Sequence, residues 1–136
     1  FLEAGTGDIT LQAVTQGTVC RLILLSAKDV TVNGALQSGA FQQLAGTGHT
    51  RLLGELSLTT TGSGGGLDFT GNDLSIEYAG TNSIAERLAV TNAGTFTTAD
   101  DAALSFKSSP QSSRGLFEVI NVLFLFEYRL MMISSR

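Results

Sequence analysis

The chain has very little of what a cross-linked, metal-bound or strongly charged protein needs. It contains one cysteine, one proline, one histidine and no tryptophan, and only 15% of its 136 residues are charged. A single cysteine excludes an internal disulfide framework and a zinc site built on several cysteines. A single proline excludes collagen and proline-rich linkers, and the low charge excludes a highly charged disordered tail. The net charge of -4 opposes a nucleic-acid-binding surface.

Glycine, threonine and aliphatic residues are abundant instead. The chain has 16 glycines, and 43% of its residues are hydrophobic, which is typical of short strands joined by tight turns. Its length suffices for one domain with a buried core. The chain begins at Phe1 without a signal sequence. We therefore expect it to be a segment of a longer protein whose export signal lies upstream.

The composition changes near residue 107. Residues 1–106 carry 15 of the 16 glycines and every threonine, alanine and aspartate. The sequence therefore predicts a repeat region over residues 1–106, a polar linker over 107–115 and an apolar C-terminal segment over 116–136. Charged residues interrupt the last segment, which disfavours a membrane span. Three alternatives stay open for it: a cap on the repeat region, a membrane or translocator-facing element, and out-of-frame or truncated sequence.

A short pattern recurs in the repeat region: an acid, an aliphatic residue, a hydroxyl residue and a second aliphatic. Its four copies begin at Asp8, Asp29, Glu55 and Asp73. The alternation of aliphatic and hydroxyl side chains is typical of strands with one buried face. Further strand-like runs lie at residues 22–25, 51–53, 67–70, 88–91, 95–97 and 104–106.

Copies spaced by about 20 residues have the natural length of one coil in a parallel β-helix. The sequence therefore predicts an all-β fold, a single-stranded β-solenoid of about five coils. Aliphatic residues would point inward, with Ile9, Val30, Leu56 and Leu74 in one interior column. Short strands with frequent turns also allow an antiparallel sandwich or a barrel, which remain the alternatives.

Five runs carry a family resemblance: VTVNGAL (residues 30–36), AFQQ (40–43), GTGHT (46–50), GGLDFTGNDLS (65–75) and AVTNAGT (89–95). They resemble the repeats of very large bacterial surface proteins, the filamentous-haemagglutinin-like and autotransporter-like adhesins. The resemblance covers about residues 5–106 and lies in repeat style rather than in an invariant signature. It implies a right-handed parallel β-helix within an exported filament, and it brings no catalytic residues. The segment after residue 107 departs from the pattern.

Residues able to carry chemistry are isolated in the sequence. His49 is expected in a solvent-exposed turn, because no Gly-x-Ser-x-Gly elbow accompanies it. Cys20 is expected to be buried as a small hydrophobe. The glycine-rich residues 62–66 lack the Gly-Lys-Ser/Thr ending of a phosphate-binding loop, so we interpret them as a corner.

Acidic residues offer two further candidates. Asp68, Asn72 and Asp73 could supply oxygens to calcium, but they match neither the nine-residue calcium-binding repeat nor the EF-hand spacing, and turn formation is the favoured interpretation. Asp100 and Asp101 form the best enzyme candidate as paired carboxylates. Neighbours in a strand point to opposite faces, however, which argues against joint acid–base catalysis.

From these features we expect a non-catalytic structural and adhesive segment of a large exported bacterial surface protein, located at the cell surface or outside the cell. No catalytic residue, metal or cofactor is assigned. Expected partners are neighbouring repeats of the same chain, and a glycan or protein that meets the polar corners at residues 46–50, 62–66 and 80–83. Nucleic acid is not expected, and membrane contact by the C-terminal segment is disfavoured.

Two rival functions belong to other classes. A β-helical enzyme acting on polysaccharide would need Asp68, Asp73, Asp100 and Asp101 on one outer face of adjacent coils. A stand-alone antiparallel sandwich acting as a binding module would need hairpin pairing instead of residues stacked about 20 apart.

Overall fold

The computed structural model describes residues 1–106, 116–121 and 132–134, and their regular structure is entirely β. Sheet A contains β1 (Leu2–Glu3), β4 (Arg21–Ser26), β7 (Ala40–Gln43), β10 (Gly66–Gly71), β13 (Arg87–Asn92) and β16 (Leu116–Asn121). Sheet B contains β2 (Ile9–Leu11), β5 (Val30–Val32), β8 (His49–Leu52), β11 (Asp73–Ile76) and β14 (Phe96–Thr98). Sheet C contains β3 (Val14–Thr15), β6 (Leu36–Ser38), β9 (Leu56–Leu58), β12 (Thr81–Ile84), β15 (Ala103–Phe106) and β17 (Met132–Ser134). Within these described ranges no helix is long and apolar enough to cross a membrane.

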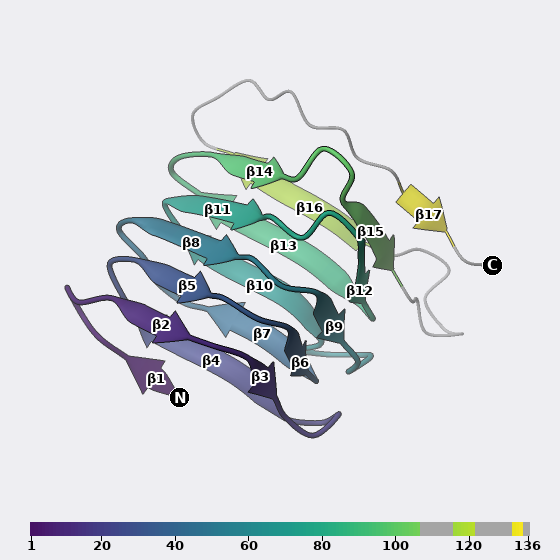
Figure 1. Cartoon of the computed structure of the whole chain (residues 1–136), viewed down its shortest axis with the longest axis horizontal. Helices are drawn as coiled ribbons and strands as arrows, with labels where there is room; N and C mark the ends of the chain where they lie inside the picture. The colour runs from purple at the N-terminus through teal and green to yellow at the C-terminus, as the bar shows by residue number, and fades with distance from the viewer. Residues whose placement is uncertain (107–115, 122–131, 135–136) are drawn as a thin grey trace.

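The chain passes through sheets A, B and C in turn and then returns to sheet A one strand further along (Figure 1). Neighbouring strands in each sheet therefore come from successive coils, and all the strand pairings are parallel. The predicted β-solenoid of about five coils is confirmed. The antiparallel sandwich is wrong for this chain, because consecutive strands lie in different sheets instead of forming hairpins.

Apolar side chains fill the interior in rows that run from coil to coil. In sheet A, Leu22, Phe41, Leu67 and Leu88 occupy equivalent positions on four successive strands. None of the four side chains is more than 5% exposed. Each coil thus covers the apolar surface of the coil before it, which explains why the aliphatic residues recur with the coil length.

The predicted interior column holds for three of its four members. Ile9 and Val30 are partners in sheet B, and Leu74 continues their row through Thr50. Leu56 lies in β9 of sheet C, so its place in the same column was wrong, although it too is buried.

The acid of the repeat has a structural role at the entrance to sheet B. The Oδ1 atoms of Asp8, Asp29 and Asp73 accept backbone N–H groups from the next coil. The donors are Asp29 at 3.3 Å, His49 at 2.8 Å and Thr95 at 2.7 Å. The bond from His49 is the main reason that the pKa of Asp29 lies below its ordinary value. These acids therefore clamp one coil to the next.

Replacing Asp73 with alanine should lower the free energy of unfolding by about 1 kcal/mol, because the Thr95 N–H and hydroxyl would lose their shared acceptor. Asp73→Asn keeps an acceptor oxygen and should lose less. Glu55, whose carboxylate bonds no other described residue, gives the matched control Glu55→Ala. Urea unfolding measures all three variants, and equal stabilities for Asp73→Ala and Glu55→Ala would contradict the clamp.

Two strands of the C-terminal segment extend the stack. β16 pairs in parallel with β13 in sheet A, and β17 pairs in parallel with β15 in sheet C. The predicted polar linker, residues 107–115, lies outside the described residues, as do residues 122–131 and 135–136.

Candidate functional site

The four aspartates proposed for an enzyme do not come together. Asp68 lies in β10 of sheet A, and Asp73 begins β11 of sheet B. Asp100 and Asp101 lie in the turn between β14 and β15. Within the described part of the chain, no group of three or more His, Cys, Asp and Glu side chains is arranged to hold a metal ion. The outer-face row of carboxylates that the enzyme hypothesis needs is therefore not formed.

The three predicted contact corners lie on three different edges of the solenoid. Residues 46–50 lead from sheet A into sheet B, residues 80–83 lead from sheet B into sheet C, and residues 62–66 lead from sheet C into sheet A. Each of them includes the start of a strand, because β8 begins at His49, β12 at Thr81 and β10 at Gly66. A single partner surface cannot include all three corners.

Cys20 is exposed, so the expectation that it is buried was wrong. It lies in the corner just before β4, outside the apolar row that begins at Leu22. Its apolar sequence neighbour Val19 is likewise 84% exposed. The buried residues therefore begin at Leu22, two residues after Cys20.

His49 also differs from the prediction, because it is the first residue of β8 and is half-buried. Its Nε2 lies 3.0 Å from the hydroxyl of Ser75 on the adjacent strand β11. Ser75 Oγ donates to Glu77 Oε1 at 2.8 Å, and Arg51 binds both oxygens of Glu77, at 2.8 and 2.9 Å. These four residues form a polar cluster on the outer face of sheet B.

The direction of the hydrogen bonds does not suit nucleophilic catalysis. A hydroxyl has one proton, and Ser75 directs it to Glu77. The bond with His49 is then donated by Nε2–H to Ser75 Oγ. Activation of a serine requires the reverse arrangement, in which a histidine nitrogen accepts the hydroxyl proton. The cluster therefore ties β8 to β11 and does not prepare Ser75 for attack.

Acidification should weaken this cluster. The hydrogen bond from Arg51 lowers the pKa of Glu77 below 4.5; burial opposes this, and the Ser75 hydroxyl adds to it. Because the pKa is lower in the folded than in the unfolded chain, the stabilisation is complete above about pH 4.5 and is lost as the pH falls through the folded value. As the pH is lowered past about 4.5, the melting temperature should therefore decrease. The decrease should be less steep in Glu77→Gln than in the wild type. Identical pH profiles for the two proteins would contradict this account.

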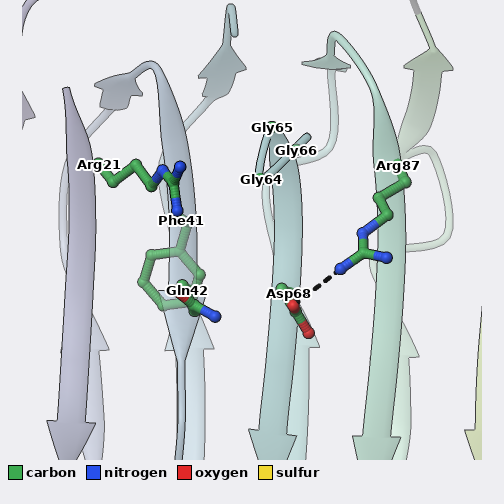
Figure 2. Close-up of a pocket in the computed structure, with 8 residues that line it drawn as sticks. All are labelled: Arg21, Phe41, Gln42, Gly64, Gly65, Gly66, Asp68 and Arg87. Carbon is green, nitrogen blue, oxygen red and sulfur yellow. Dashed lines mark hydrogen bonds and ion pairs between the residues drawn. The ribbon is translucent and has the colours of Figure 1, made fainter. Parts of the chain in front are cut away.

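A second polar feature is a hollow on the outer face of sheet A (Figure 2). Its lining residues come from four successive coils: Arg21, Phe41, Gln42, Gly64, Gly65, Gly66, Asp68 and Arg87. Its volume is about 20 Å³, which is room for a water molecule or a small polar group.

Sheet register brings the two arginines to the same level. Arg21 is the partner of Ala40, and Ala40 is the partner of Gly66. Arg87 is at the equivalent position on the next strand, because Leu67 and Leu88 are partners. Small residues thus lie between two arginines, and their lack of bulk creates the hollow.

The glycine-rich corner holds the Arg21 side chain in place. Gly64 has a φ of +82°, and a Cβ there would lie 2.6 Å from Arg21 Nη2 and 2.7 Å from its Cζ. The guanidinium therefore packs against the bare backbone of Gly64, where a side chain would displace it. Residues 62–66 thus form the corner that the sequence predicted, and in addition they lie against the side chain of Arg21.

The other side of the hollow carries an ion pair. Arg87 Nη2 lies 2.9 Å from Asp68 Oδ2, with 40% and 35% of the two side chains exposed. Gln42 is half-buried on β7, which lies between the strands of Arg21 and Asp68, and it adds an amide group. The hollow therefore offers one paired and one further guanidinium, a carboxylate and an amide.

This site was not predicted from the sequence. A signal was present, because Arg21 and Arg87 each begin a similar run, an arginine followed by three apolar residues, RLIL and RLAV. Aligning those two runs would have placed both arginines on one level of one outer face. Searches of family models, of curated proteins and of solved structures found no match to the chain, so the assignment of this site depends on its own geometry.

Proposed function

We propose that this chain is a structural and adhesive segment of a large exported bacterial surface repeat protein, and that it is not itself catalytic. The observation that supports this most is the in-register stacking of coils through three parallel sheets. Five coils at about 4.8 Å each make a rod about 25 Å long. The resemblance of the repeats to those of filamentous surface adhesins is the second support.

The physical properties of the fold suit extension and display. Each coil contacts only its neighbours, so a solenoid can be lengthened by adding coils without a new core. Backbone hydrogen bonds run along the rod from coil to coil. For example, the Leu74 N–H donates to the carbonyl oxygen of Thr95 in the next coil, at 2.9 Å. The outer faces are free to vary, because their side chains do not fill the interior.

Binding assays test the adhesive part of the proposal. Beads coated with the whole chain are applied to arrays of glycans and of extracellular-matrix proteins. Beads coated with a double variant, Phe69→Ala with Leu74→Ala, provide a control in which the core is disrupted. We expect the wild type to bind at least one class of array and the double variant to bind none. Absence of binding to both classes would contradict an adhesive role.

Surface labelling tests the export part. Antibodies raised against the chain should label intact cells of the organism that produces it. Labelling that requires permeabilised cells would contradict a cell-surface location.

A further inference from the structure

We propose that the hollow at Arg21 binds the carboxylate of an acidic glycan. The inference rests on the proposed adhesive function and names the ligand class that one surface of the rod would recognise. Its starting point is the juxtaposition of Arg21, Gln42, Asp68 and Arg87 around a hollow of about 20 Å³ (Figure 2).

The first argument is charge. Residues 1–106 contain four cationic side chains, and three form ion pairs: Lys28 with Asp29, Arg51 with Glu77, and Arg87 with Asp68. Arg21 forms no ion pair with a carboxylate among the described residues. Since Arg87 and Asp68 neutralise each other, the hollow retains the positive charge of Arg21 in a protein whose net charge is -4. That local charge favours an anionic group.

The second argument is geometry. A guanidinium presents a planar fork of donors that matches a carboxylate in a bidentate fashion. Contact with the bare backbone of Gly64 on one side limits the rotamers open to the Arg21 fork, although the side chain is exposed. Less conformational entropy is then lost on binding than for a free surface arginine. Lys28, by contrast, lies at the edge between sheets A and B, where its side chain is 57% exposed and is paired with Asp29.

The third argument selects a sugar over a peptide. The hollow admits a carboxylate-sized group and excludes a sugar ring, so the ring would lie over the outer face of sheet A. There, Gln42 and Asp68 offer an amide and a carboxylate to ring hydroxyls. None of the large exposed apolar side chains of the described residues lines the hollow, and Phe41, which does, is 0% exposed. An acidic peptide would therefore find no apolar anchor.

Calorimetric titration of the whole chain with three probes tests the proposal. The probes are oligogalacturonate, a neutral galactose oligomer of the same length, and oligoglutamate. We expect oligogalacturonate to bind most tightly, with an affinity that falls as salt is raised, because the contact is exposed. The variants are Arg21→Gln, Arg21→Lys and, as a control for loss of one positive charge, Lys28→Gln. Binding should weaken about tenfold or more in Arg21→Gln, less in Arg21→Lys, and less than about twofold in Lys28→Gln.

Several results would overturn the inference. Equal binding of the neutral oligomer would remove the role of charge, and equal or tighter binding of oligoglutamate would assign the site to acidic peptides. Unchanged affinity in Arg21→Gln, or no binding of any probe, would also overturn it. Circular dichroism melting verifies that each variant is folded. If Arg21→Gln does not fold, the weaker binding expected of Arg21→Lys tests the role of the guanidinium instead. If Arg21→Gln beads still bind the glycan or matrix arrays as the wild type does, the adhesive function stands and this inference alone fails.

Discussion

Replacement of Phe69 with alanine is expected to lower the free energy of unfolding by about 3–5 kcal/mol, a large fraction of the total stability of a small domain. The side chain is 0% exposed in the interior behind sheet A. Its partners on the neighbouring strands are Gln43 and Val90, so its loss would leave a cavity that spans three coils. Urea unfolding followed by circular dichroism measures the change.

Thr70 provides the matched control in the same strand. It follows Phe69 in β10 but faces outward and is exposed. Thr70→Ala should therefore change the free energy of unfolding by less than about 0.5 kcal/mol. Phe69→Leu fills part of the cavity and should lie between the two, which keeps the comparison informative if Phe69→Ala does not fold. Similar losses for Phe69→Ala and Thr70→Ala would contradict the assignment of inner and outer faces.

Gly66→Ala is expected to cost about 2–5 kcal/mol, from about 1–2 kcal/mol for a left-handed backbone and about 1–3 kcal/mol for steric overlap. Gly66 has a φ of +85° and begins β10. A Cβ there would lie 2.6 Å from the backbone nitrogen of Arg87 and even closer to its carbonyl oxygen. The strand of the next coil cannot move away without breaking its register.

Gly62 separates the two contributions, because it has the same φ of +85° but no atom within 4 Å of a Cβ. Gly62→Ala should therefore cost only the backbone contribution, about 1–2 kcal/mol. Thermal and urea unfolding compare the two variants. If Gly62→Ala were as destabilising as Gly66→Ala, close coil-to-coil contact at Gly66 would not be the cause.

Most of the fold could be predicted from the sequence, because each coil buries apolar side chains at equivalent positions and the pattern therefore recurs with the coil length. The pattern that begins at Asp8, Asp29 and Asp73 marks sheet B in three coils. It failed in the third coil, where the strand of sheet B is β8 and the first of its two inward residues is Thr50. The Thr50 hydroxyl donates to Gln43 Oε1 at 2.9 Å, so a buried polar pair replaces the expected aliphatic residue. Periodicity could not reveal this polar pair. The copy of the pattern that begins at Glu55 was misleading, because it leads into β9 of sheet C instead of a strand of sheet B.

The candidate site was less accessible to sequence reasoning, because its residues are distant in the chain. Arg21 and Arg87 reach one level only through the register of four strands. Register depends on the lengths of the corners, which vary among coils and carry no periodic signal. The same reason explains His49 and Ser75, whose contact joins adjacent strands in sheet B. Side chains that meet between coils can be predicted only after the coils have been aligned.

Disulfide formation between engineered cysteines tests the parallel, in-register stack most directly. Thr10 and Thr31 are partners in sheet B, and Thr31 is in turn the partner of Arg51. Strand spacings of about 4.8 Å put Thr10 and Thr31 within disulfide reach, and Thr10 and Arg51 at about 9.6 Å, beyond it. In a Cys20→Ser background, Thr10→Cys with Thr31→Cys should therefore cross-link on mild oxidation, whereas Thr10→Cys with Arg51→Cys should not. Cross-linking of the second pair in preference to the first would contradict the solenoid.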